Sequence, residues 1–170
     1  METERWEIDS AHSEILFSVH QLGTATVRGR FTRWSASVHV EGGELTHGHI
    51  DVLIDPSSVA TGDRGIDEQL MGASWLDVES HPEATFKSTR IRVLKGNRLR
   101  VGGLLMVRGL EVELTLDAKL LGRTKDPWGN ERVALRGKAA LVPASLRVPL
   151  LLAAIERVDL VIQVEGVKQP

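Results

Sequence analysis

Residues 6–31, WEIDSAHSEILFSVHQLGTATVRGRF, contain the pattern that decides the fold class. Apolar side chains recur at alternate positions, with polar residues largely between them: Trp6, Ile8, Ile15, Phe17 and Val19. Successive side chains of a β-strand point to opposite faces, so this alternation predicts a ribbon with one buried face. Gly23 interrupts the pattern, and Val27 and Phe31 resume it. The stretch therefore predicts a β-hairpin.

The same alternation recurs along the chain and predicts further strands over residues 34–40, 50–54, 84–93, 99–106, 112–120, 133–141 and 158–164. Turn sequences separate several of them: Gly42-Gly43, Lys95-Gly96-Asn97, Arg108-Gly109 and Asp126-Pro127-Trp128-Gly129. Gly102-Gly103 lies inside a predicted strand and favours a β-bulge or a sharp coil there. No helix-rich crossover separates the strands, which argues against a parallel sheet. We therefore expect a closed antiparallel barrel of about eight strands in up-and-down order, which leaves no open sheet edge.

In one segment the apolar residues have helical spacing instead of the alternation of a strand. Ile66, Leu70 and Met71 have helical spacing, and Asp63 precedes them as a candidate N-cap. We predict a short helix over residues 63–71, after the fourth strand, that closes one end of the barrel with Trp75 packed beneath it. Trp128 is likewise expected to plug a barrel end. Residues 144–157 have no clear pattern and fit either a loop or a short helix.

Length and composition narrow the functional classes. A chain of 170 residues predicts a single domain, residues 1–170. The net charge is −2 and the 21 basic residues are interleaved with 23 acidic ones, so no nucleic-acid partner is expected. There is no cysteine, which excludes disulfides, thiolate nucleophiles and zinc–thiolate sites.

The N-terminal sequence METERWEIDS has neither the basic start nor the apolar run of a secretory leader. The longest apolar run, residues 150–155, is too short to span a bilayer, so we expect no stable membrane insertion. These features predict a cytoplasmic protein, or a periplasmic or secreted one if a leader has been removed. The chain has only three Phe, four Trp and no Tyr, and this scarcity of bulky fillers favours a hollow barrel.

Several separated stretches resemble the bacterial YceI-like family, in the family's order. They are WEIDSAHSEILFSVHQLG with VRGRF, DRGIDEQLMGASWLDVESHPEATFKST, VGGLLMVRGLEVELTLDAKLLG and KDPWGNER, which together span about residues 6–136. VPASLRVPLLLAAIERV, at residues 142–158, departs from the family, which usually has an aromatic and an acidic residue there. The final strand is again family-like. The resemblance implies a lipocalin-like barrel that holds a polyisoprenoid or similar long-chain lipid.

The function implied by the resemblance is to bind, transport or sequester an isoprenoid-type or fatty-acid-type lipid, without catalysis and without a cofactor. The candidate wall residues are the apolar ones that point inward in the predicted strands: Phe17, Val19, Phe31, Ile50, Val52, Phe86, Met106, Leu114, Leu116 and Leu135. The alternative is that the same residues fill a solid core. The family often forms dimers, so a homodimer is compatible with the resemblance.

Polar residues suggest chemistry at three places, each with a simpler explanation. His47 and His49 share a predicted strand face, as a metal site needs, but two ligands do not make a site. Asp77, Glu79 and His81 fit turn hydrogen bonds better than acid catalysis. Asp9, His12 and Ser13 are the residue types of a nucleophile relay, but no Gly-X-Ser-X-Gly elbow accompanies them. No metal site is predicted.

Three arginines in family-like turns could meet an anionic head group: Arg28, Arg108 and Arg132. Salt bridges to neighbouring glutamates are the simpler interpretation. Two other functions compete with lipid binding: an enzyme acting on a lipidic substrate, and a filled barrel that docks a partner through the leucine-rich residues 144–157. The first lacks a coherent catalytic constellation in the sequence.

Overall fold

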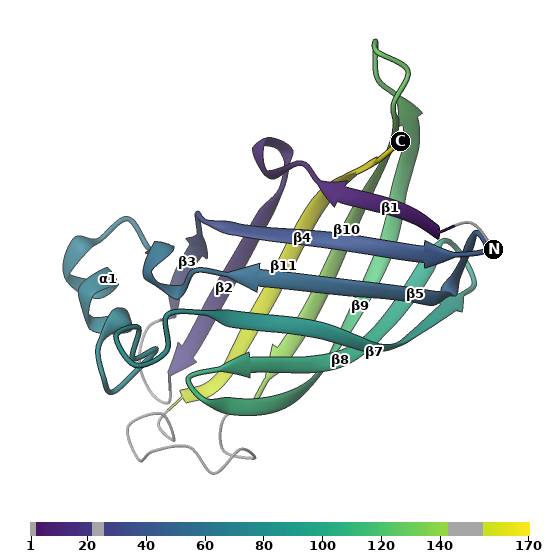
Figure 1. Cartoon of the computed structure of the whole chain (residues 1–170). Helices are drawn as coiled ribbons and strands as arrows, with labels where there is room; N and C mark the ends of the chain where they lie inside the picture. Colours follow the sequence, from purple (N-terminus) through teal and green to yellow (C-terminus); the bar gives the residue numbers. More distant parts are fainter. Residues whose placement is uncertain (1–2, 22–25, 143–154) are drawn as a thin grey trace.

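The apolar alternation of the sequence produces strands that all pair antiparallel (Figure 1). The computed structural model describes residues 3–21, 26–142 and 155–170. Its strands are β1 (Thr3–Ile8), β2 (Glu14–Gln21), β3 (Val27–Phe31), β4 (Trp34–Glu41), β5 (Glu44–Ile54), β6 (Val59–Ala60), β7 (Ala84–Leu94), β8 (Arg98–Val107), β9 (Leu110–Lys125), β10 (Glu131–Leu141) and β11 (Ile155–Lys168). The helical elements are the 3-10 turns η1 (Ser10–His12) and η2 (Pro56–Ser58) and the α-helix α1 (Arg64–Met71).

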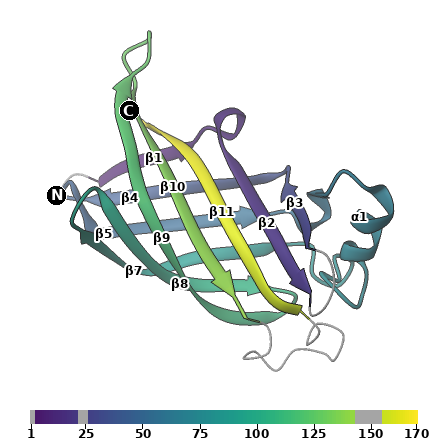
Figure 2. The same ribbon diagram turned by 180° about the vertical axis from the view of Figure 1, so that it is seen from behind.

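Eight strands form a closed ring in the order β1, β4, β5, β7, β8, β9, β10 and β11, after which β11 returns to β1. β11 pairs with β10 along one edge and with two strands along the other, where its residues 155–163 pair with β2 and its residues 166–168 pair with β1. β3 and β6 continue the sheet outward from β2. Figure 2 shows β9, β10, β11 and β2 side by side on the back of the molecule. The predicted all-β, up-and-down barrel with a short helix is confirmed.

The opening hairpin is present as β2 and β3, with Ile15 opposite Phe31 and Val19 opposite Val27. Trp6 and Ile8 belong to a separate strand, β1, because η1 interrupts the ribbon between them and Ile15. The Asp9 carboxylate caps η1 by accepting the Ala11 N–H at 3.1 Å. This interruption lets consecutive segments of the chain share β11 as a partner.

The helix forms where its capping signal predicts it, and it lies at one end of the barrel (Figures 1 and 2). Asp63 is the N-cap, and its side chain accepts the Ile66 N–H at 3.2 Å. Leu70 is buried in a cluster with Phe17 and Val59. Trp75 packs against the same cluster, so the helix and the segment after it cover apolar strand residues.

The glycine pair in β8 faces a bulge, but the extra residue is on the neighbouring strand. Ser88 pairs with Gly103 and Arg90 with Gly102, which leaves Thr89 as the additional residue of β7. β8 itself runs on without a change of phase, so Leu105 is buried and Met106 is 41% exposed. The expected inward position of Met106 is therefore wrong, because it assumed that the glycines shift the alternation by one residue.

The plug predicted for Trp128 is also wrong. Trp128 is 81% exposed at the tip of the β9–β10 hairpin, which extends beyond the barrel (Figure 1). The first residue of the turn stabilises it, because the Asp126 carboxylate accepts the backbone N–H groups of Trp128 and Asn130, each at 2.9 Å. Most of residues 144–157, predicted as a loop or helix, lies outside the described residues; β11 begins at Ile155.

Candidate ligand cavity

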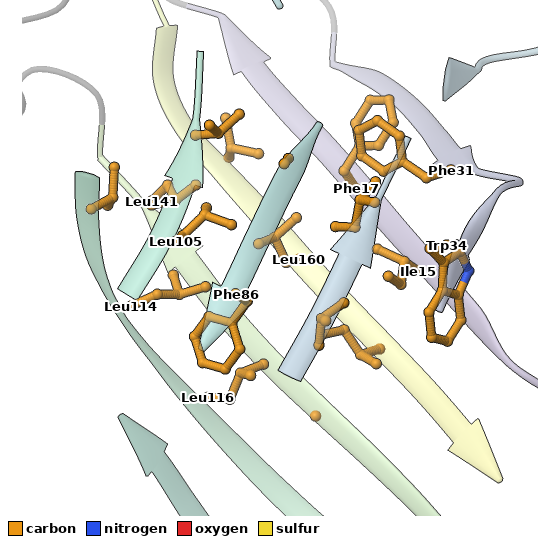
Figure 3. A pocket seen from close by; sticks show the side chains of 18 of the residues that line it. Ile15, Phe17, Phe31, Trp34, Phe86, Leu105, Leu114, Leu116, Leu141 and Leu160 are labelled. Atoms are coloured by element: carbon orange, nitrogen blue, oxygen red, sulfur yellow. The ribbon is translucent and has the colours of Figure 1, made fainter. Parts of the chain in front are cut away.

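The barrel encloses a cavity of about 350 Å³ whose described walls are almost entirely apolar. Figure 3 shows side chains from several strands that line it, among them Phe17, Phe86 and Leu160. No described side chain is less than 2% exposed, and inward-facing residues such as Val112 keep about 3%. In a filled core the largest side chains lose all contact with solvent. The cavity volume shows that the barrel is hollow, and the small remaining exposure of the inward-facing side chains agrees with it.

The structure places nine of the ten predicted wall residues in this lining: Phe17, Val19, Phe31, Ile50, Val52, Phe86, Leu114, Leu116 and Leu135. Met106 lies on the outer face, and its neighbour Leu105 takes the inner position. Strict alternation from Leu99 and Val101 through the glycine pair would have found Leu105. Trp34 also lines the cavity and was expected on a strand but not as a wall residue.

Two glycines hold phenylalanine rings against the wall. A Cβ atom on Gly103 would lie 2.5 Å from Cζ of Phe86, and one on Gly29 would lie 2.5 Å from Cζ of Phe17. Such distances mean that each ring packs directly on the backbone of the neighbouring strand. The rings of Phe17 and Phe31 also pack together, with centroids 5.4 Å apart. Rings that lie on the wall leave the middle of the barrel open.

The α1 end of the cavity carries a charged side chain. Leu70, Trp75 and Leu76 line the cavity there, together with Arg108 from the β8–β9 turn. The Arg108 guanidinium donates through Nη2 to the carbonyl oxygen of Ala73. Its Nε atom is buried and has no hydrogen-bond partner among the described residues. Every other described residue of the lining is uncharged.

A polar cluster lies beyond the other end of β9, outside the cavity lining. Arg132 donates to Asp9 Oδ2 at 3.0 Å, to Asp126 Oδ2 at 3.1 Å and to Glu165 Oε1 at 3.2 Å. Its side chain is only 18% exposed. These hydrogen bonds, with the one to Asp9 first, raise the pKa of Arg132 above its ordinary value. The predicted salt-bridged role therefore applies to this arginine.

Two carboxylates of the cluster, Asp9 and Asp126, are held in their charged form. Hydrogen bonds from His12 and Arg132 lower the pKa of Asp9, although partial burial opposes them. Burial alone would raise the pKa of Asp126, but donors from Asn130, Arg132 and Trp128 lower it to about 2. Both groups are ionised at neutral pH.

The candidate relay at η1 is part of this cluster. His12 Nδ1 lies 2.8 Å from Asp9 Oδ2, as a relay requires, and the His12 side chain is 62% exposed. The Ser13 hydroxyl, however, accepts the Glu165 backbone N–H at 3.0 Å and so joins β11 to the chain after η1. Asp9 is shared between His12 and Arg132, which is the arrangement of a structural link between β1 and β10.

The remaining polar candidates are exposed or tied into turns. His47 Nδ1 lies 3.6 Å from Glu44 Oε2 on the surface. The backbone N–H of His81 donates to the backbone carbonyl of Asp77 at 2.9 Å, as in a turn. Arg28 is exposed on β3 and does not line the cavity. In the part of the chain that the structure describes, no three His, Cys, Asp or Glu side chains gather as a metal site needs.

Within residues 3–21, 26–142 and 155–170, no helix has the length and apolar character to cross a membrane.

The fold and cavity together define a class of protein, the eight-stranded antiparallel barrels that enclose an apolar cavity of ligand size. Within that class, the YceI-like domain family matches residues 6–164, and the chain belongs to this family. The UPF0312 protein of Vibrio parahaemolyticus is 32% identical over 160 residues, which cover 94% of this chain and 84% of that protein. A UPF0312 protein of Pseudomonas paraeruginosa is 31% identical over 162 residues, covering 95% and 84%.

Solved structures share the fold at low sequence identity. BcnA of Burkholderia cenocepacia superposes with a TM-score of 0.79 at 21% identity, over 93% of this chain and 98% of that one. A polyisoprenoid binding domain from Saccharophagus degradans, described as implicated in plant cell wall breakdown, superposes with a TM-score of 0.67 at 15% identity, over 96% and 98%. At these identities the likeness establishes the fold.

Proposed function

We propose that this protein binds a long-chain lipid inside its barrel, and so carries or sequesters it without changing it chemically. The observation that supports this most directly is the enclosed cavity with an almost wholly apolar described lining. An apolar interior of this kind offers no polar partners for water or for a hydrophilic substrate, whereas an alkyl or isoprenoid chain is stabilised there. The polyisoprenoid binding domain from Saccharophagus degradans, which shares the fold, supports an isoprenoid-type ligand. A fatty-acid-type chain is the alternative that the same apolar lining would accept.

The expected affinity follows from the buried chain. Each buried methylene contributes about 0.8 kcal/mol, so a chain of about twenty carbons gives roughly 16 kcal/mol before losses. The practical limit for ligands of this size, about 0.3 kcal/mol per heavy atom, leaves roughly 6 kcal/mol. That corresponds to a dissociation constant on the order of tens of micromolar. The chain supplies affinity with little discrimination, so selectivity depends on cavity length and on polar contacts.

We assign the contacts with the chain to the nine inward residues of the sequence prediction together with Leu105. They come from several strands: Phe17, Val19 and Phe31 lie on β2 and β3 in the cluster that contains Leu70 of α1, and Leu114, Leu116 and Leu135 lie on β9 and β10. Because contacts are spread over many apolar side chains, removing one of them weakens binding only moderately. Filling the cavity is the sharper test.

Adjacent residues of β8 provide a matched pair of variants. Leu105 points into the cavity and Met106 is 41% exposed on the outer face. Leu105→Trp adds volume inside the barrel, so we expect at least about a tenfold rise in the dissociation constant for geranylgeraniol or palmitic acid. Met106→Trp adds the same side chain outside and should leave the dissociation constant unchanged.

A change in intrinsic tryptophan fluorescence measures this binding in the wild type, because Trp34 and Trp75 line the cavity and a bound chain changes the surroundings of their rings. Isothermal titration calorimetry checks the variants, since the added indole changes the fluorescence signal. Circular dichroism confirms that both variants are folded. Equal binding by both variants, or no binding by the folded wild type, would contradict the proposal.

A further inference from the structure

We infer that the outer face of β7 to β10 docks this protein on the surface of an anionic phospholipid bilayer. Six exposed cations lie on this face with one carboxylate among them, and we call the seven residues the basic face. They form two rows across the strands: Arg98, Lys119 and Arg136 in the first, and Arg92, Arg100, Asp117 and Lys138 in the second. The choice of a bilayer as partner rests on the proposed function, because a long-chain lipid is exchanged with a membrane.

The strand register places like charges of the basic face directly opposite one another. Arg98 pairs with Lys119, and Lys119 pairs in turn with Arg136. In the second row Arg92 pairs with Arg100. Side chains at such positions lie about 5 Å apart at Cβ, where like charges are destabilising. An anionic partner converts this repulsion into a gain in binding.

The cations of the basic face point away from the cavity and have little compensation within the chain. Leu99, Ala118 and Gly137 lie between the two rows and line the cavity, so the rows on either side of them face outward. Among the described residues, Arg100 is the only one of the six cations with an ion pair, to Asp117 at 3.0 Å. The other five are available to anions in solution or on a surface.

The concentration of positive charge is local. Elsewhere the register sets opposite charges against each other, as for Lys87 opposite Asp51 and Lys125 opposite Glu131. The whole chain has a net charge of −2, so the basic face does not follow from a basic composition. Acidic and basic residues alternate along the sequence, and the cations come together only because four strands pair in this register.

The hairpin that continues β9 and β10 favours a bilayer over a nucleic acid as the partner. It extends beyond the barrel, and its tip carries Trp128, which is 81% exposed (Figures 1 and 2). Leu121 on the same hairpin is 53% exposed. Tryptophan is enriched at membrane–water interfaces, and clustered Lys and Arg are attracted to anionic lipids. A bilayer uses the charges and the exposed apolar side chains, whereas a nucleic-acid duplex uses the charges alone.

Cosedimentation of the full-length protein with lipid vesicles tests this inference. One set of vesicles is phosphatidylcholine alone, and the other contains about one-third phosphatidylglycerol, which is anionic. We expect binding to the anionic vesicles at about 0.1 M salt, where charges act over about 10 Å, and release at about 1 M, where they act over about 3 Å. Binding to phosphatidylcholine alone should be at least about tenfold weaker.

Two triple variants with the same change in net charge show where the bilayer binds. The first removes the first row of the basic face: Arg98→Gln, Lys119→Gln and Arg136→Gln. It should fold, because it removes repulsion between opposite residues, and its partition onto anionic vesicles should fall by about tenfold to a hundredfold. The control removes three exposed cations outside the basic face: Arg28→Gln, Arg64→Gln and Lys87→Gln. Its partition should stay within about threefold of the wild type.

A DNA duplex of about twenty base pairs serves as the competing polyanion at the same salt concentration. We expect the wild type to bind it at least about tenfold more weakly than the anionic vesicles. Binding to the duplex as tight as to the vesicles would identify a nucleic acid as the partner and overturn the inference. Circular dichroism confirms that all proteins in the comparison are folded.

The outcomes separate docking from the cargo binding proposed above. No binding of the folded wild type to anionic vesicles, or equal losses in the two triple variants, would overturn docking while cargo binding stands. The basic-face variant should bind geranylgeraniol as the wild type does, because none of its three changed residues lines the cavity. If the wild type binds anionic vesicles but neither geranylgeraniol nor palmitic acid, the proposed function fails and the docking surface stands.

Discussion

Arg108 precedes the first residue of β9 and Arg132 lies on β10 beside the other end of β9, and the two arginines have opposite surroundings. Arg132 is enclosed by Asp9, Asp126 and Glu165, and its charge is fully compensated inside the protein. Arg108 contacts a backbone carbonyl, has an unpartnered Nε and lines an apolar cavity. The comparison teaches that the same residue type is held by three carboxylates at one end of the barrel and by a single backbone carbonyl, among the described residues, at the other.

The largest effect is expected when Arg132, whose charge is balanced by carboxylates, is replaced by an uncharged residue. Arg132→Met leaves three carboxylates close together without their common partner, so we expect the thermal midpoint to fall by several degrees. Lipid affinity should be unchanged, because Arg132 does not line the cavity. Arg136→Met, an exposed arginine on the same strand, is the control. Differential scanning calorimetry measures both; an equal midpoint for the two variants would contradict the structural role of Arg132.

The apolar cavity wall depends on phenylalanine rings that pack on glycine backbone, as Phe86 does on Gly103. A Cβ on Gly103 would lie 2.5 Å from both the Lys87 carbonyl oxygen and Cζ of Phe86, whereas one on Gly102 comes no closer than 3.9 Å to the Arg90 carbonyl. We expect Gly103→Ala to lower the free energy of unfolding by about 1–3 kcal/mol. Gly102→Ala should change it by less than about 0.5 kcal/mol. Urea denaturation compares them, and equal losses would mean that Phe86 does not pack on Gly103.

Low pH is expected to weaken the ion pairs of Arg132, because its partners Asp9 and Asp126 become protonated. The pKa of Asp126 is about 2, below its ordinary 3.8, so the folded state favours the charged carboxylate. Its contribution is complete above pH 3.8 and is lost as the pH falls through about 2. Asp9 acts in the same direction, because its pKa is also lowered.

The wild type should therefore lose stability over this range more steeply than Asp126→Asn, which has no carboxylate to protonate at that position. Urea midpoints measured at several pH values between the two pKa values would show the difference. Parallel curves for the two proteins would mean that Asp126 is not held in its charged form by the fold.

The smallest effect is expected at Trp128. Its side chain is 81% exposed at the hairpin tip, so Trp128→Ala should change the free energy of unfolding by less than about 0.5 kcal/mol. Chemical denaturation of the purified variant measures this. A loss comparable to that of Gly103→Ala would show that Trp128 packs on the barrel after all.

The sequence was sufficient for the features that local patterns control. Period-2 alternation located the strands, and Asp63 before a helical period located α1. Nine wall residues were found by the same alternation, since a strand that keeps its phase shows which face is buried. The error at Met106 arose where a bulge was expected in β8, whereas the structure has it at Thr89 of β7. A bulge is a property of a strand pair, and one strand's sequence does not reveal which partner carries it.

The roles of the arginines could not be separated from the sequence. Arg28, Arg108 and Arg132 occur in similar turn-like motifs, and their difference depends on distant partners. Asp9 is 123 residues from Arg132 in the chain, and it reaches the arginine only because β1 and β10 both pair with β11. The orientation of Trp128 was unpredictable for a related reason, since its turn has no alternation to define an inner face.

Native mass spectrometry of the freshly purified protein, followed by organic extraction, tests the central claim most directly. A hollow lipid-binding barrel is expected to carry the additional mass of a single-chain lipid, which is released on denaturation and recovered in the extract. An unliganded mass that stays unchanged after incubation with geranylgeranyl monophosphate and palmitic acid would contradict the account.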